Sequence, residues 1–273
     1  WELCRDSIQK LGHPVLLNHH VTALEMARGK VVAVRANTPD GVRRFPSDHV
    51  ISTMPVRSLA RSFEPAVPDD IRSAAEGLRY RDFLMVALIL DRDKLFADNW
   101  IYVHTPGLKV GRVQNFNNWS AAMVPHADQT CLGMEYFCFK GDGLWDMKDA
   151  DLVQMAFAEL GSLGLAPGAS LIDSSVVRMP KAYPIYDAAY RANLDKTRSF
   201  LDPIPNLHTI GRNGMHKYNN QDHSMLTAMM TVWNMQGASH DVWEVNTDFD
   251  YHEEQRVNPQ APASTDALVS TNR

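Results

Sequence analysis

The stretch that decides the fold runs from residue 206 to residue 237, NLHTIGRNGMHKYNNQDHSMLTAMMTVWNMQG. Residues 206–210 are typical of a short buried strand, and Gly211 follows where the backbone must bend or let another group approach closely. A polar loop over residues 212–222 comes next. It leads into an apolar-periodic helix, in which Met225, Met229, Val232, Trp233 and Gln236 fall at helical spacing and Leu226 and Met230 widen the stripe. The candidate N-caps of this helix are Asn220, Asp222 and Ser224.

This order of strand, glycine, polar loop and capped helix is suited to form a binding site for an anion or a polarised ring. The free N–H groups at a helix start carry partial positive charge toward whatever lies there. The loop of eleven residues, 212–222, is longer than the roughly two to six residues that usually join a strand to a helix. This length favours a binding function, and an ordinary strand-to-helix connection is the alternative that the residues alone leave open.

Two motifs carry a resemblance to a known family. Gly211-Arg212, His216-Lys217-Tyr218 and Asp222 resemble, in that order, the last flavin-contacting motif of UDP-galactopyranose mutases. Related proteins include bacterial flavin oxidoreductases of the protoporphyrinogen-oxidase and amine-oxidase superfamily. The upstream run KAYPIYD, residues 181–187, is similar to a Tyr-Pro segment that precedes the motif in those relatives. The resemblance implies a flavoprotein that uses FAD.

The resemblance also implies a fold class and a division into domains. We expect an α/β (mixed α+β) chain in which an FAD-binding Rossmann-like domain holds an inserted, mostly antiparallel sheet-and-helix substrate domain. The expected ranges are 1–55 and 206–255 for the FAD-binding part, 56–205 for the substrate domain and 256–273 for a disordered tail rich in Pro, Ala, Ser and Thr. No Gly-x-Gly-x-x-Gly turn occurs. The sequence is therefore interpreted as a fragment whose partner is a missing N-terminal segment of the same protein.

Composition narrows the class of protein. The chain has 273 residues, 45% hydrophobic and 22% charged, which describes a globular protein with a substantial core. A net charge of −5 argues against a nucleic-acid surface, which is usually basic. No apolar run approaches the ~20 residues of a membrane span. Cys4, Cys131 and Cys138 have no metal-ligand spacing, and residues 131 and 138 should lie on opposite faces of one strand, so a reducing cytoplasmic location is expected.

Periodicity and turn residues give the remaining elements. Predicted helices span residues 1–11, 56–63, 69–78, 149–163 and 187–201. Predicted strands span residues 15–18, 21–26, 30–36, 48–54, 83–90, 100–104, 112–116, 130–139 and 170–179. Arg28-Gly29 should close a hairpin between the second and third of these strands, and Pro39-Asp40-Gly41 should form a turn.

Candidate site residues follow from the two motifs. A guanidinium binds phosphate through two hydrogen bonds, so Arg212 suits the pyrophosphate of a dinucleotide. In the mutases the matching arginine lies beside the flavin. A surface arginine paired with a nearby carboxylate is the alternative. A cationic and phenolic cluster at the end of the strand at 170–179 and in the loop after it suits an anionic or sugar-like small-molecule substrate. An ordinary strand end with solvated cations is the alternative. Catalytic candidates are Arg178, Lys181, Tyr183 and Tyr186. Cofactor-binding candidates are Val21, Met54, Pro184, Gly211, Arg212, Asn219, Asn220, Asp222, His223, Ser224 and Met225.

Other chemistries find little support. Eleven histidines include no His-Glu-x-x-His pattern, and no metal is expected. No Gly-x-Ser-x-Gly elbow indicates serine hydrolysis. Trp100, Tyr102, Trp119 and Tyr136 are candidate stacking residues, with core packing as the alternative. The expected reaction is hydride transfer between a small substrate and flavin N5, and the alternatives are a mutase-like isomerisation with reduced flavin or a non-catalytic binding fragment.

Overall fold

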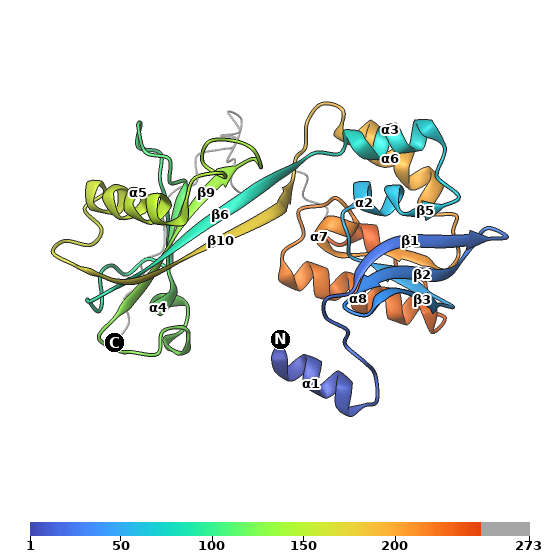
Figure 1. Ribbon diagram of the computed structural model, residues 1–273, viewed down its shortest axis with the longest axis horizontal. Helices are drawn as coiled ribbons and strands as arrows, with labels where there is room; N and C mark the ends of the chain where they lie inside the picture. The colour runs from blue at the N-terminus through green and yellow to red at the C-terminus, as the bar shows by residue number, and fades with distance from the viewer. Residues whose placement is uncertain (247–273) are drawn as a thin grey trace, which may run out of the picture.

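The computed structural model describes residues 1–246 and has a mixed α/β architecture, as predicted (Figure 1). Its described residues form two hydrophobic cores. One core gathers Leu24, Leu59, Ile71, Leu194 and Leu207. The other gathers residues from the large sheet and its covering helix. Two long strands, β6 (Tyr80–Leu90) and β10 (Leu171–Pro184), belong to the second sheet and reach toward the first core (Figure 1).

The first sheet confirms the predicted hairpin and adds a strand. β1 (His20–Ala27) pairs antiparallel with β2 (Lys30–Thr38), and the predicted turn then leads to β3 (Gly41–Pro46), which the sequence analysis missed. The predicted strand at residues 15–18 is wrong, because Asn18 takes a positive φ of 58° in a turn, which breaks an extended run.

A short parallel pair holds the motif in place. β4 (Val50–Ser52) pairs with β11 (Leu207–Thr209), so the predicted strands at 48–54 and 206–210 are present but shorter. β5 (Phe63–Glu64) pairs parallel with β1, where the sequence analysis had predicted the end of a helix. α1 (Glu2–Lys10) contains no buried residue.

Three helices pack in the first core. These are α2 (Val56–Arg61), α3 (Asp69–Gly77) and α6 (Tyr190–Leu201), near the predicted positions. The expected domain boundaries at residues 55/56 and 205/206 therefore do not coincide with the change of core. The chain enters the second core along β6 and leaves it along β10.

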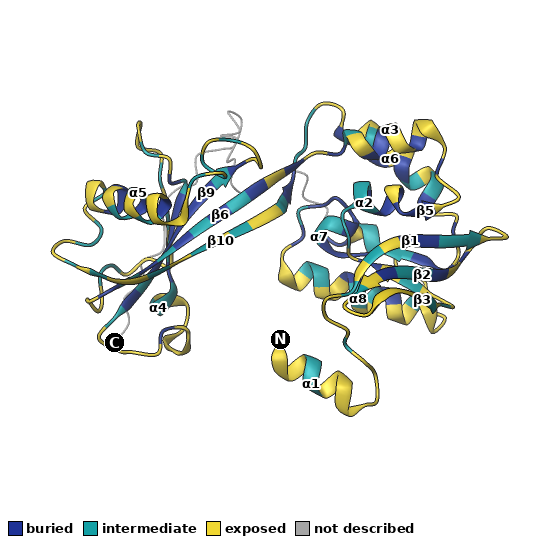
Figure 2. Ribbon diagram, in the orientation of Figure 1, coloured by how far each residue is buried: buried dark blue, intermediate teal, exposed yellow. Residues whose placement is uncertain are grey.

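The second unit is an antiparallel sheet in the order β10-β6-β9-β8-β7. Its remaining strands are β7 (Trp100–Tyr102), β8 (Arg112–Asn115) and β9 (Thr130–Cys138). α5 (Asp149–Ser162) covers one face, where Leu84, Met134 and Leu152 are fully buried (Figures 1 and 2). Between β8 and β9 lie α4 (Phe116–Trp119) and a 3-10 turn, η1 (Ala121–Met123). This unit matches the expected mostly antiparallel sheet with helices.

The decisive stretch continues from β11 into α7 (Gly211–Gly214), the loop and α8 (Gln221–Met235), followed by a 3-10 turn, η2 (Val242–Glu244). The predicted apolar-periodic helix is present as α8, but its apolar stripe is not covered by the described residues, since Met225, Met229 and Trp233 are exposed while Thr227 and Thr231 are buried. Among residues 1–246, no helix is long and apolar enough to cross a membrane. The predicted tail at 256–273 lies outside the described residues.

Candidate functional site

Arg212 is the centre of the candidate site. Gly211 takes a φ of +74° after β11, a conformation that favours glycine, and so turns the chain into α7. The Arg212 guanidinium donates from Nε to the Asn219 carbonyl at 2.8 Å and from Nη1 to the Ala182 carbonyl at 3.0 Å. Its Cζ lies 5.0 Å from the centre of the Tyr183 ring. The two sequence motifs therefore meet in space at this arginine.

Two tyrosine rings stand beside the Arg212 guanidinium. Tyr183 and Tyr218 stack with ring centres 5.7 Å apart and planes inclined by 18°. The Arg212 Cζ is 4.7 Å from the Tyr218 ring. Tyr218 belongs to the quoted motif, yet the sequence analysis did not select it. Its place opposite Tyr183 depends on the fold of the intervening helix and strand.

A buried ion pair supports the phenol of Tyr183. Arg112 donates from Nη2 to the Tyr183 oxygen at 2.9 Å and from Nε to Glu135 at 2.5 Å. Gln114 also donates to the Glu135 carboxylate. Burial raises the pKa of the Tyr183 phenol, so it stays protonated at neutral pH. The sequence analysis missed Arg112, Gln114 and Glu135 because only strand pairing brings β8 and β9 to Tyr183.

The start of α8 is capped yet keeps two free donors. The Asn220 N–H donates to His223 Nδ1 at 3.2 Å in a capping box, and Ser224 Oγ donates to the Asn220 carbonyl at 2.9 Å. The backbone N–H groups of Gln221 and Asp222 bond to nothing among residues 1–246. Asp222 and Met225 are exposed side chains. Two donors and the helix dipole remain available to an acceptor there.

Asn219 contributes an unpaired acceptor. Its side chain is almost fully buried, and Nδ2 donates to the Gly211 carbonyl at 3.4 Å, while Oδ1 has no partner in the described part of the chain. A buried oxygen without a donor costs about 1–3 kcal/mol. The site thus offers a buried acceptor, helix-start donors, a guanidinium and flat aromatic rings. These fit a flavin ring, which has carbonyl acceptors, an imide N–H donor and a flat face.

A second hollow, of about 610 Å³, brings together three other predicted residues, Val21, Met54 and Lys181. Lys181 has a φ of +57°, its N–H donates to Asp82 at 2.6 Å, and its Nζ donates to Ser58 Oγ at 3.1 Å. Burial, followed by nearby arginine charge, lowers the pKa of Lys181. None of the described residues that line this hollow is acidic, so it suits an anionic group.

The other predicted catalytic residues lie in two different places, Tyr186 near Arg212 and Arg178 at the start of α5. The Tyr186 oxygen accepts from the Tyr218 N–H at 2.6 Å, close to Arg212, and Pro184 ends β10. Arg178 instead pairs with Leu84, a residue of the face that α5 covers. Its guanidinium binds Asp149 at 2.6 Å and the carbonyls of Trp145 and Met147. These contacts give Arg178 a structural role at the start of α5, away from the other three.

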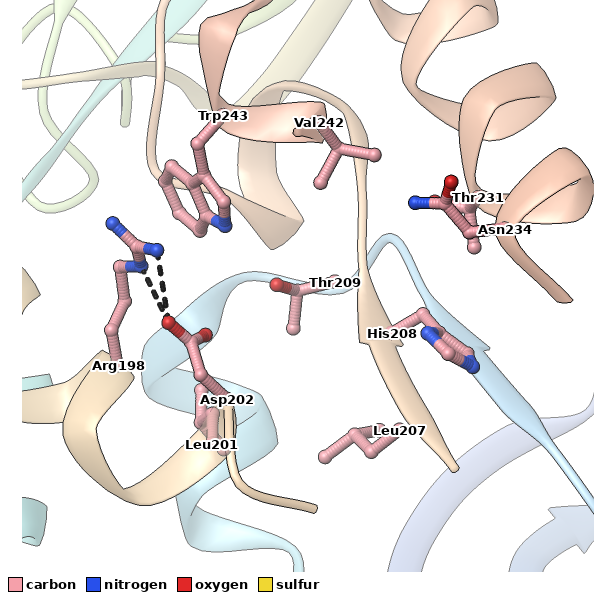
Figure 3. A pocket seen from close by; sticks show the side chains of 10 residues that line it. All are labelled: Arg198, Leu201, Asp202, Leu207, His208, Thr209, Thr231, Asn234, Val242 and Trp243. Atoms are coloured by element: carbon pink, nitrogen blue, oxygen red, sulfur yellow. Dashed lines mark hydrogen bonds and ion pairs between the residues drawn. The ribbon is translucent and has the colours of Figure 1, made fainter. Parts of the chain in front are cut away.

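A smaller cavity of about 190 Å³ lies between α6, β11, α8 and η2 (Figure 3). Arg198 pairs with Asp202 at 2.9 Å, and its Cζ lies 3.9 Å from the Trp243 ring (Figure 3). Arg198, the one arginine among the described residues that line this cavity, is thus already paired with a carboxylate. None of the predicted site residues is among those described lining residues, so Arg198 is a suitable control for Arg212.

The fold thus joins the unit that carries Arg212 to a separate antiparallel sheet. The sequence profile of the flavin containing amine oxidoreductases matches residues 1–212. The chain therefore belongs to that family, which confirms the predicted superfamily and the predicted FAD cofactor. No protein with a curated description matches the chain.

Solved structures agree on the fold. A reduced UDP-galactopyranose mutase superposes with a TM-score of 0.75 at 18% identity, over 90% of this chain and 52% of the mutase. A putative protoporphyrinogen oxidase from Exiguobacterium sp. 255-15 gives 0.56 at 16% identity, over 79% and 47%. An oxidoreductase from Methanosarcina mazei gives 0.57 at 14% identity, over 84% and 52%. The chain thus spans about half the length of these proteins.

Proposed function

We propose that this chain is the C-terminal part of an FAD-dependent oxidoreductase that transfers hydride between a small substrate and flavin N5. The observation that carries the proposal is the position of Arg212, held over Tyr183 and Tyr218 beside the open start of α8. Family membership supports the enzyme class. When bound, the flavin supplies the group that accepts or gives hydride.

The residues of this chain are proposed to bind and orient the flavin and the substrate. Arg212 and the free N–H groups of Gln221 and Asp222 stabilise negative charge on the bound ring. Asn219 accepts a hydrogen bond through its unpaired oxygen. Tyr183, kept protonated and fixed by Arg112, presents a neutral phenol to the substrate side of the site.

Lys181 is proposed to hold an anionic group in the hollow that it lines with Val21 and Met54. Its Nζ donates to Ser58 Oγ at 3.1 Å, and Arg61, which also lines the hollow, is paired with Glu76 at 3.1 Å. Arg178 is not proposed for this task, because its guanidinium is already bonded to residues 145–149. We therefore expect Lys181 to bind the anionic group of the substrate.

A mutase-like isomerisation with reduced flavin is the second candidate. The mutase superposes with a higher TM-score than the oxidase does, and the sequence has an arginine directly after Gly211. A non-catalytic binding fragment is the third candidate. It is supported by the short span of the chain relative to those structures.

We also propose that a further segment of the same protein covers the exposed methionine stripe of α8. Such a stripe is typical of a contact surface. β4 has one strand partner in the described chain, so its other edge can take another strand. A cytoplasmic location is retained as a prediction from the three free cysteines.

The test is anaerobic mixing of the full-length, flavin-loaded protein with a substrate panel. Bleaching of the oxidised flavin band by one substrate is the expected result. Turnover only after prior reduction, without net oxidation of the substrate, would support the mutase form instead. If the full-length protein takes up no flavin, both enzyme forms fail and the binding fragment is favoured.

A further inference from the structure

The strand β7 forms one edge of the second sheet, and its outer side has no strand partner among residues 1–246. On its inner side the Asn99 carbonyl and the Val103 N–H bond to the backbone of residues 111–115, at 2.8 and 2.9 Å. Backbone groups of successive residues in an antiparallel strand point to alternate sides. The N–H and C=O groups of Trp100 and Tyr102 therefore point outward, where another strand can bond to them.

The sequence of β7 has none of the features that usually keep an edge strand apart from other chains. Its residues are Trp100, Ile101 and Tyr102, with no charge and no proline. The edge strand β10 instead contains Pro180 and several charged side chains, and the edge strand β3 contains two adjacent arginines and Pro46. An unprotected apolar edge is a template for strand pairing with another chain.

The aromatic side chains at this edge lie partly in solvent. Trp100, Tyr102 and Trp119, here named the aromatic edge, are 46%, 40% and 44% exposed. The Trp100 ring centre is 5.2 Å from that of Trp119 and 6.4 Å from that of Tyr102. Exposed rings in mutual contact are typical of a surface that another protein covers, because covering them removes apolar area from water.

A second copy of the chain can pair with β7 by symmetry. If a two-fold axis passes through Ile101, the two β7 strands run antiparallel, and Trp100 of one copy lies opposite Tyr102 of the other. Both residues direct their backbone groups outward, so each such pair can exchange two hydrogen bonds. The same pairing brings the two aromatic side chains together across the strands, which stabilises an antiparallel pair.

The residues that flank β7 are complementary in this register. Asp98 of one copy lies opposite His104 of the other, so an acidic side chain meets a basic one. Both side chains are exposed. An axis through Tyr102 would instead place Asp98 opposite Pro106, which has no N–H to donate. Charge and backbone donors therefore favour the axis at Ile101.

We propose that β7 pairs with β7 of a second copy around a two-fold axis at Ile101, which joins the two five-stranded sheets into one continuous sheet. This interface goes beyond the proposed function and does not depend on the flavin site. A strand of three residues covers less than the roughly 800 Å² per partner of a standard interface. We therefore expect a dissociation constant on the order of micromolar.

Sedimentation equilibrium of the full-length protein measures this constant. Trp100→Lys combined with Tyr102→Lys places lysine opposite lysine and should weaken dimerisation about 10- to 100-fold, because like charges replace two aromatic pairs. Trp100→Lys combined with Tyr102→Glu places opposite charges at the same positions and should restore most of the affinity. The matched control is Trp1→Lys, at an exposed tryptophan outside the sheet, which should change nothing.

Disulfide cross-linking tests the register. Ile101 lies on the proposed axis, where the two Cα atoms of a non-hydrogen-bonded pair are about 4.5 Å apart, within reach of a disulfide. The test uses a Cys4→Ser background, because Cys4 is an exposed cysteine. Ile101→Cys should form a covalent dimer under mild oxidation. Asn99→Cys, on the same side of the strand, should not, since the two copies of residue 99 are about 13 Å apart along the strands.

Three results would overturn the interface: a full-length protein that stays monomeric at high micromolar concentration, a dimer that the two lysines do not weaken, or a cross-link with Asn99→Cys and none with Ile101→Cys. Amide hydrogen exchange over residues 98–104 then identifies the cause of a monomer. Slow exchange would mean that another segment of the full-length protein covers β7, and fast exchange that the edge stays open. Circular dichroism identifies a variant that fails to fold, in which case the cross-link decides.

Discussion

One loop places a permanent charge and a neutral imidazole four residues apart. Arg212 is held by two backbone carbonyls and two tyrosine rings. His216 is fully buried between the rings of Tyr80, 4.6 Å away, and Tyr190, 5.6 Å away. Neither of its ring nitrogens has a partner among residues 1–246. The loop therefore carries the proposed cofactor-binding arginine at one end and a buried, uncharged histidine at the other.

Burial lowers the pKa of His216 to about 4, and this predicts acid sensitivity. The unfolded chain takes up the proton near the ordinary value of 6.5. The contribution of neutral, buried His216 to the free energy of unfolding should thus be fully present above pH 6.5. It should be lost as the pH drops toward 4, and the total loss should be about 3 kcal/mol. Urea unfolding of the full-length protein at pH 7, 5 and 4 measures the loss. His216→Phe should flatten the profile by that amount, and an unchanged profile would contradict the prediction.

Sequence reasoning reached part of this residue-level detail. Arg212 and Tyr183 could be selected because each belongs to a motif, and the structure brings them together. Arg112 and Glu135 could not be selected, since their significance comes from cross-strand pairing of β8 with β9. Arg178 was selected as a member of the cationic and phenolic cluster at the strand end. Strand register sends it to the opposite face of the sheet.

At the scale of elements, strand β10 and helix α8 set the geometry. The predicted strand at 170–179 continues to Pro184. Pro180 is tolerated because β10 is an edge strand, where a missing N–H costs little. The register shifts between Met179 and Tyr183, and Asp82 binds the displaced Lys181 N–H. Periodicity could not show that a strand crosses such an irregularity.

The turn from β11 into α7 depends on Gly211. With φ at +74°, Gly211→Ala should cost about 1–2 kcal/mol in stability and displace Arg212. Gly237→Ala is the matched control, because Gly237 has a φ of +105° at the far, exposed end of α8. Both variants should lower the melting temperature of the full-length protein, yet only Gly211→Ala should weaken FAD binding. Equal FAD affinity in the two would contradict the role given to this turn.

At the scale of the whole molecule, the sequence predicted the fold class correctly, but helical spacing did not show which face of α8 the described fold would bury. An α/β fold with an antiparallel sheet-and-helix unit follows from strand alternation and from the resemblance. The orientation of α8 does not, because Thr227 and Thr231 face the described fold and the apolar stripe lies opposite. An apolar stripe predicts burial without saying which part of the protein covers it.

If another segment covers α8, a charge on the stripe should be costly. Met229→Lys in the full-length protein should reduce the free energy of unfolding by about 2–4 kcal/mol, as for a charge placed in an interior contact. Val42→Lys, on the exposed strand β3, should change it by less than about 0.5 kcal/mol. Chemical denaturation measures both. Two equally mild effects would show that α8 stays open in the full-length protein.

The central claim is that a flavin lies at the start of α8 beside Arg212, and the FAD dissociation constant of arginine variants tests it most directly. Arg212→Ala in the full-length protein should weaken FAD binding by about 10- to 100-fold, the loss of one charge-assisted contact of roughly 1.5–3 kcal/mol. Arg198→Ala removes an arginine that also lies over an aromatic ring, in the smaller cavity, and should leave FAD affinity unchanged. Unaltered FAD affinity in Arg212→Ala, or an equal loss in Arg198→Ala, would contradict the account.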